Sequence, residues 1–174
     1  MNTEAKLTPV REAHRFNEAA LAEYLKPQLD GFSKPISILQ FEGGQSTPTF
    51  LLDCGNYKYV LRKKPPGNLL PSAHQVDREF RVMQALGHTD VPVPKMLLLC
   101  EDEEVIGTTF FVMEYVDGRL FGNVALPGLS PGECRAIYLE MIRVLAALHS
   151  IDYVALDLSD FGKPGNSFAR QVGR

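Results

Sequence analysis

The chain has few of the residues that build disulfide frameworks and metal sites. Its 174 residues include three cysteines (Cys54, Cys100 and Cys134) and four histidines. The number of cysteines is odd and no two have Cys-x-x-Cys spacing. Buried thiols in a reducing compartment are therefore favoured over disulfides or zinc. The histidines are scattered along the chain, so no cluster of metal ligands is visible.

Long hydrophobic runs and an excess of positive charge are also missing. No apolar run approaches the ~20 residues that a membrane-spanning helix needs. Residues 1–15 contain Glu4 and Glu12 and lack an apolar core, which argues against a secretory signal and against a transit peptide. The net charge of -3 disfavours nucleic acid or an acidic membrane as the main partner. We expect a cytoplasmic protein, with a mitochondrial or peroxisomal location as the alternative for part of a longer protein.

Apolar periodicity predicts an α+β layer ahead of a long helix. The hydrophobic content of 45% and charged content of 22% are ordinary for a soluble, core-forming protein. A helix is expected first, then three strands in a tight meander, a second helix and two more strands. The helices are expected at 17–26 and 73–86, and the strands at 36–41, 49–54, 57–62, 95–100 and 108–115. This order predicts a five-stranded antiparallel sheet with one packed helix.

The composition changes after Gly118. Ser130-Pro131-Gly132-Glu133 is a capping box with proline at the first helical position, and it begins a helix that runs to about His149. Apolar residues surround this helix, so burial on more than one side is expected. Little sequence follows to provide it, so we expect the helix to lack its full set of packing partners and to expose apolar surface. The predicted division is a helical extension over 1–35, a lobe over 36–116 and an incomplete second lobe over 117–174.

A glycine turn separates the first two strands of the expected sheet. It consists of Gly43, Gly44, Gln45 and Ser46. Glycines on a hairpin let backbone N–H groups approach phosphate oxygens closely. Taken alone, the pattern fits a plain hairpin turn better than a phosphate site.

A cation and a carboxylate follow on the third strand and the second helix. Side chains alternate along a strand, so Val60 and Arg62 share a face, where an apolar wall and a guanidinium would suit a nucleotide. The alternative is a solvated arginine in a basic run with Lys63 and Lys64, and we weigh the two evenly. Glu79 lies near the buried side of the helix and needs a cationic partner. Arg62 is the proposed partner, and a local pairing within the helix is the alternative.

The last expected strand, 108–115, runs into an acidic turn that ends at Gly118. It fits either a buried strand with a turn or a hinge whose backbone pairs with a purine edge. Singly, each of the four signals is weak. Their order, from glycine hairpin to strand cation, helix carboxylate and hinge, matches the nucleotide-binding lobe of protein kinases.

Several segments carry a family resemblance that covers nearly the whole chain. They are FEGGQSTPTF at 41–50, YVLRKKPPG at 59–67, LLP at 69–71, VDREF at 76–80, FVME at 111–114, PGLSP at 127–131, FG at 161–162 and RQV at 170–172. With these segments the chain resembles the aminoglycoside phosphotransferase-like branch of the kinase fold. It is more closely similar to the kinase-like domain that some proteins carry ahead of an acyl-CoA dehydrogenase domain.

The resemblance implies an ATP site in a kinase-like lobe. The glycine turn 43–46 would cover the ATP phosphates. Arg62, paired with Glu79, would take the place of the strand lysine of protein kinases. Met113 would lie behind the adenine, and backbone groups of Glu114 and Val116 would contact its edge.

The family's catalytic residues are absent from this sequence. They come from a His-Gly-Asp loop with an asparagine five residues on, and from a later aspartate that holds Mg²⁺. Asp160-Phe161-Gly162 spells the kinase metal motif, but only eight residue steps separate it from Asp152, the one candidate for the catalytic loop. We expect 160–162 to be a loop before another helix. No catalytic residue or metal ligand is assigned, and Mg²⁺ is expected only in a complete protein.

Three functions stay open. The first is the N-terminal fragment of an ATP-dependent kinase for a small-molecule hydroxyl, with a hydroxyacyl-CoA as the candidate substrate. A full-length protein would then carry an acyl-CoA dehydrogenase domain after it. The second is a non-catalytic nucleotide-binding or regulatory module. The third is an inert truncated isoform.

Overall fold

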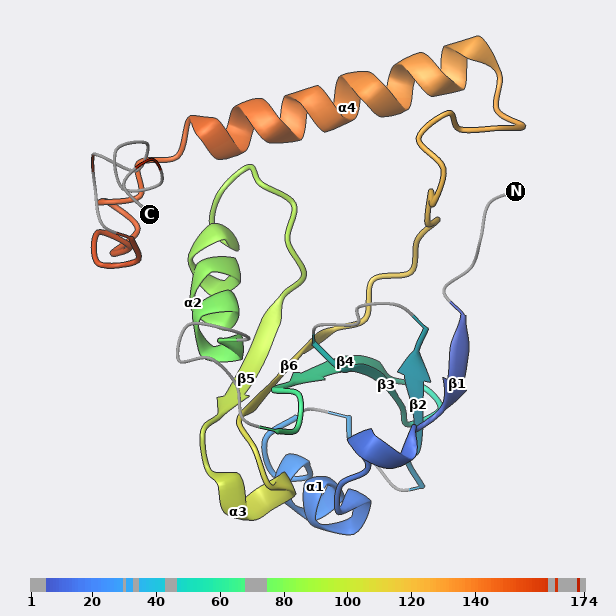
Figure 1. The fold of residues 1–174 in the computed structure, drawn as a ribbon, viewed down its shortest axis with the longest axis vertical. Coiled ribbons are helices and arrows are strands. Elements are labelled where there is room, and N and C mark those ends of the chain that lie inside the picture. Colours follow the sequence, from blue (N-terminus) through green and yellow to red (C-terminus); the bar gives the residue numbers. More distant parts are fainter. Residues whose placement is uncertain are drawn as a thin grey trace.

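The sheet of this protein is antiparallel and has six strands in the order β1-β2-β3-β4-β6-β5 (Figure 1). The computed structural model describes residues 6–29, 31–32, 35–42, 47–67, 75–162, 165 and 172. The strands are β1 Leu7–Pro9, β2 Ser37–Phe41, β3 Thr49–Asp53, β4 Lys58–Lys63, β5 Met96–Cys100 and β6 Phe110–Glu114. The expected α+β class and antiparallel meander are confirmed.

The sixth strand corrects the expected number of five. β1 pairs with β2, with Leu7 opposite Phe41 and Pro9 opposite Leu39. A three-residue segment is too short to show a period of two, so only its pairing identifies it as a strand. Its position at the edge of the sheet also accommodates Pro9, because a proline cannot donate to the ladder.

Helices cover both faces of the sheet, whereas the sequence predicted a single packed helix. On one face α2 (Val76–Leu86) places Val76 and Phe80 against Phe111. On the other face lie α1 (Glu18–Leu25) and the single-turn α3 (Glu103–Ile106). They share a core with the inner strands β3, β4 and β6, which includes Leu21, Leu25, Phe50, Leu61, Ile106 and Phe110. The predicted extension 1–35 thus contributes β1 to the sheet and α1 to the layer that covers it, and the domain division itself stays a prediction.

Local capping signals set the helix ends that the sequence predicted. The Asn17 side chain accepts a hydrogen bond from the Ala20 N–H at 3.0 Å and begins α1. At α4 (Pro131–His149) the Glu133 carboxylate accepts from the Ser130 N–H at 2.8 Å, and Ser130 Oγ accepts in return from the Glu133 N–H at 3.3 Å. The expected capping box is therefore confirmed.

α4 lacks packing partners on its apolar sides, as the sequence predicted. None of its residues is buried, and it crosses the top of the molecule away from the sheet (Figure 1). A short 3-10 turn, Glu12–His14, precedes α1 at the opposite end of the fold. Among the described helices, none combines the length and the apolar character needed to cross a membrane.

Candidate functional site

A cavity of about 620 Å³ opens where β6 leaves the sheet. Four of the predicted site residues line it: Val60, Met113, Glu114 and Val116. Strand register explains the grouping, because Val60 lies opposite Met113 across the β4–β6 pair. Glu114 and Val116 follow where the chain turns out of the sheet. The expected hinge thus borders a real cavity.

Several other residues that line this cavity were missed in the sequence, among them three from the first strands of the sheet. Leu7, Phe41 and Thr49 come from β1, β2 and β3. Leu7 and Phe41 lie opposite each other in the β1–β2 pair. Thr49 lies opposite Arg62 in the β3–β4 pair. Their place at the cavity depends on strand pairing, and no local motif marks it.

Arg62 and Glu79 form the predicted ion pair between β4 and α2. Arg62 Nη1 lies 3.0 Å from Glu79 Oε1, and the two side chains are 28% and 31% exposed. Arg62 lies on the same face of β4 as Val60, as the alternation of side chains predicted. The buried Nε of Arg62 has no hydrogen-bond partner among the described residues. A buried N–H without an acceptor is costly, so this edge of the guanidinium suits an added acceptor.

The hinge backbone is partly used by the protein itself. The Glu114 N–H donates to the Lys95 carbonyl at 3.0 Å. The Glu114 carboxylate accepts from the Lys95 N–H at 2.8 Å. Val116 lies beyond the strand, is 61% exposed and makes no hydrogen bond to another described residue. Glu114 and Val116 were both predicted to contact a purine through their backbones. Val116 is the one whose N–H and carbonyl both lack a hydrogen-bond partner among the described residues.

The predicted glycine turn, Gly43, Gly44, Gln45 and Ser46, lies outside the described residues. In the part of the chain that the structure describes, no three His, Cys, Asp or Glu side chains gather as metal ligands.

The Asp160-Phe161-Gly162 segment is a turn, as expected, and it contacts α2. The Asp160 carboxylate accepts two hydrogen bonds from Arg81, at 2.7 and 2.8 Å. These bonds lower the pKa of Asp160 and raise that of Arg81. Arg78 stacks over the Phe161 ring, 4.2 Å from its centroid. The aspartate is therefore engaged in holding the segment 157–161 to α2.

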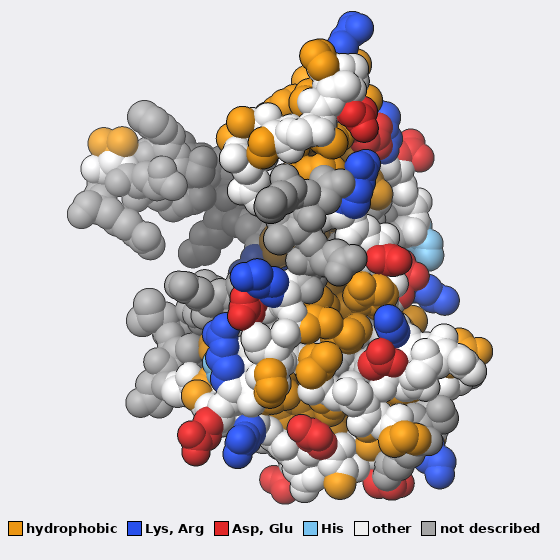
Figure 2. Space-filling view, turned by 90° about the vertical axis from the view of Figure 1, so that its right-hand side faces the viewer, with side chains coloured by type: hydrophobic (Ala, Val, Ile, Leu, Met, Phe, Trp, Pro, Cys, Tyr) orange, Lys and Arg blue, Asp and Glu red, His pale blue; other side chains and the backbone are white. Residues whose placement is uncertain are grey.

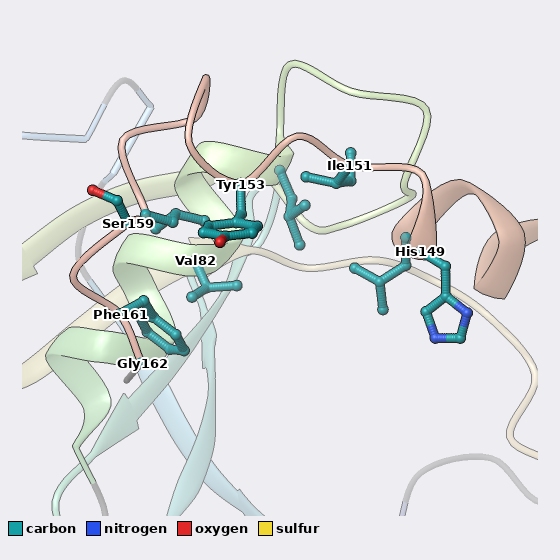
Figure 3. Close-up of a pocket in the computed structure, with 10 residues that line it drawn as sticks. Val82, His149, Ile151, Tyr153, Ser159, Phe161 and Gly162 are labelled. Carbon is teal, nitrogen blue, oxygen red and sulfur yellow. The ribbon is translucent and has the colours of Figure 1, made fainter. Parts of the chain in front are cut away.

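A second cavity, of about 540 Å³, lies between α2 and the segment that follows α4. Figure 3 shows Val82 on α2 near Phe161 and Tyr153, with His149 and Ile151 further along. The described residues of its walls are mostly apolar and include no lysine, arginine or carboxylate side chain. That lining does not suit a phosphate group.

Comparison with known proteins identifies the family. The pattern of the family described as "Phosphotransferase enzyme family" matches residues 37–174. Human acyl-CoA dehydrogenase family member 11 is 47% identical over 173 residues, which are 97% of this chain and 22% of that protein. This chain thus spans about a fifth of the length of the curated relatives it matches.

Solved structures agree with this assignment. A Ralstonia eutropha protein described as an aminoglycoside phosphotransferase is 50% identical, with a TM-score of 0.78 over 92% of this chain and 46% of that chain. A thermostable mutant of aminoglycoside phosphotransferase APH(4)-Ia, solved with AMP-PNP and hygromycin B, has a TM-score of 0.50. It is 20% identical and covers 78% of this chain and 40% of its own, so it supports the fold alone. The resemblance inferred from the motifs is confirmed, and the chain belongs to the phosphotransferase enzyme family.

Proposed function

We propose that this chain binds ATP in the hinge cavity, as the nucleotide-binding portion of a kinase that phosphorylates a hydroxyl group of a small molecule. The observation that carries the proposal is the Arg62–Glu79 ion pair, 3.0 Å long, on the sheet face that also presents Val60 and Met113. It combines a fixed cation with an apolar wall, which are the two surfaces that a nucleotide needs.

The cavity fits a nucleotide in size and in chemistry. Its volume of about 620 Å³ lies within the range of roughly 300–1,000 Å³ for small-molecule sites. Val60 and Met113 offer apolar contact to a purine, and the free backbone groups of Val116 can pair with its edge. Arg62 and Glu79 do not line the cavity itself, but Arg62 lies on the same sheet face as Val60. Its Nε has no partner among the described residues and can donate to a phosphate oxygen, while Glu79 holds the other side of the guanidinium. The AMP-PNP complex of the distant fold neighbour makes ATP the nucleotide to test first.

The described residues bind and orient but do not complete a transfer reaction. Bound ATP would supply the phosphoryl group. No described carboxylate set fits Mg²⁺, and the sequence contains no His-Gly-Asp loop. We therefore assign no catalytic residue, and we expect no transferase activity from this chain alone.

The acceptor and the wider protein are part of the proposal. The curated relatives are acyl-CoA dehydrogenase family proteins about five times longer than the matched region. A longer form of this protein would carry an acyl-CoA dehydrogenase domain after the kinase-like region. A hydroxyacyl-CoA is then the acceptor to test first.

The test is ATP binding by calorimetry with an arginine-matched control. We expect Arg62→Ala to weaken ATP roughly tenfold or more, because a charge-assisted hydrogen bond to phosphate is lost. Arg143→Ala on α4 removes another paired arginine, one bound to Glu140, and should leave ATP affinity unchanged. Equal ATP affinity in wild type and Arg62→Ala would contradict the site.

Two outcomes separate the alternatives. ATP binding without turnover, both in this chain and in a longer form that contains the catalytic motifs, would favour a regulatory nucleotide-binding module. An unfolding temperature that ATP does not change would favour an inert isoform, since a ligand of the native state must stabilise it. Substrate-independent ATP turnover that Arg62→Ala abolishes would refute the prediction that this chain is inactive.

A further inference from the structure

Lys63, the residue after Arg62, is buried on the opposite face of the sheet. It lies opposite Phe110 in the β4–β6 pair and is 4% exposed. Its Nζ lies 6.0 Å from the centroid of the Phe16 ring, at the outer limit of a cation–π contact. No carboxylate or other acceptor among the described residues bonds to this ammonium. Burial of the side chain disfavours its charged form and lowers the pKa of Lys63.

Lys63 borders a cavity of about 470 Å³ that contains two more cations. Arg15 comes from the end of the short turn before α1, and Lys64 follows Lys63 along the chain. One carboxylate, Glu103, also lines the cavity, and it forms no ion pair with the three cations in the described part of the chain. The Thr108 hydroxyl adds a neutral hydrogen-bonding group at the same wall. Positive charge therefore exceeds negative charge in a polar, partly enclosed space.

We infer that this cavity binds a phosphate monoester, with Lys63 as the buried anchor and Arg15 and Lys64 contributing from the cavity walls. The cavity has three cationic side chains and one carboxylate side chain. This excess of positive charge favours a ligand with two negative charges over a ligand with one. An arginine in the set adds a planar fork that matches phosphate oxygens. The cavity volume exceeds that of a phosphate group, which leaves space for the group that carries it.

The site is separate from the hinge cavity. Arg62 and Lys63 are neighbours on β4, so their side chains point to opposite faces of the sheet. The hinge cavity lies on the Arg62 side, whereas the anion cavity lies on the side covered by α1 and α3. An anion bound here would be an additional ligand, and the inference does not depend on ATP binding.

The competing explanation is a lysine that only extends its methylene groups through the core and leaves Nζ near Phe16 and water. The two explanations differ in what Lys63→Met should do. If the ammonium is an anchor, the variant loses anion binding. If it only passes through the core, anion binding has no reason to change. In both cases the variant nearly keeps the volume of the side chain and removes the charge of a largely buried residue, so it should fold.

The experiment measures binding of inorganic phosphate and glycerol 3-phosphate to the whole chain by calorimetry, at ionic strength matched with chloride. We expect saturable binding that Lys63→Met weakens roughly tenfold or more, by loss of a charge-assisted hydrogen bond. Lys26→Met, at the exposed end of α1, makes the same chemical change away from the cavity and should have no effect. Arg15→Gln, at an exposed position, should weaken binding without risk to the core.

Three outcomes would overturn the inference. One is a response to phosphate no larger than the response to chloride. Another is unchanged phosphate binding in Lys63→Met and Arg15→Gln. The third is loss of phosphate binding when ATP saturates the protein, which would place the phosphate at the hinge instead. Tighter binding of glycerol 3-phosphate than of inorganic phosphate would identify a phosphate ester as the ligand of this site. Equal binding of the two would identify free phosphate as its ligand.

Discussion

Leu61 on β4 and Leu145 on α4 show how differently the two regions of this molecule use the same side chain. Leu61 is 0% exposed, and Leu145 is 51% exposed. In the sheet region, helices on both faces bury the strands. Along α4, Leu139, Met141 and Ile142 are more than half exposed, and hydrophobic side chains reach the surface at the top of Figure 2, where this helix lies.

The comparison shows that a long helix can be specified by its own sequence without being buried. α4 starts at a complete capping box and is rich in alanine and leucine, so its backbone structure needs no partner to be specified. The sheet depends more on tertiary contacts, because ladders such as that between β4 and β6 join residues distant in sequence. Stability should therefore be concentrated in the sheet region.

The largest expected difference comes from deleting the same side chain in each region. Leu61→Ala should lower the free energy of unfolding by about 3 kcal/mol, from lost burial and a residual cavity. Leu145→Ala should change it by less than about 0.5 kcal/mol, because the side chain is already half in solvent. Urea denaturation of both variants measures this, and equal costs would mean that α4 is buried in solution.

An ion pair in each region gives a second, smaller contrast. Glu79→Gln should cost about 1 kcal/mol, because it leaves the partly buried Arg62 with a weaker partner. Glu140→Gln, whose partner Arg143 is exposed on α4, should produce no measurable change. The same denaturation experiment compares them. A larger loss at Glu140 would reverse our ranking of the two regions.

The ion pair between Arg81 on α2 and Asp160, in the segment after α4, should make a small contribution to stability that depends on pH. Arg81 holds the pKa of Asp160 below its ordinary value, so this pair stabilises the fold above that value and is lost as pH falls through the folded-state pKa. Asp160→Asn should be slightly less stable than wild type at neutral pH, and the difference should shrink below about pH 4. Thermal unfolding across pH tests this, and a difference that grows in acid would contradict it.

The smallest expected effect on stability accompanies a change in association. The exposed apolar side of α4 favours self-association of the chain. Ile142→Lys should leave the unfolding temperature unchanged, because Ile142 is 62% exposed, and should shift gel filtration toward monomer. A wild-type chain that elutes as a clean monomer and unfolds in one sharp transition would refute the prediction.

Much of the fold and part of the site could be predicted from local patterns. Alternation within β4 placed Val60 and Arg62 on one face, and the order of elements identified Glu79 as the partner of Arg62. β1 was missed because three residues carry no period, and α3 because a single acidic turn has little helical signal. Leu7 and Phe41 were missed at the cavity because their place there depends on the β1–β2 pairing. The roles of Gly43, Gly44, Gln45 and Ser46 stay predictions, because these residues lie outside the described part of the chain.

The sequence by itself determined the order of the longer elements, the capping box of α4 and the faces of β4, because each depends on neighbours within a few residues. Only the tertiary structure decided what covers each of those faces. Arg62 and Lys63 formed part of one basic run in the sequence, with solvation of the whole run as one interpretation. In the folded chain Arg62 meets Glu79 from α2, while Lys63 is enclosed on the side of α1 and α3. Burial depends on segments far apart in sequence, and the run of basic residues contains no information about them.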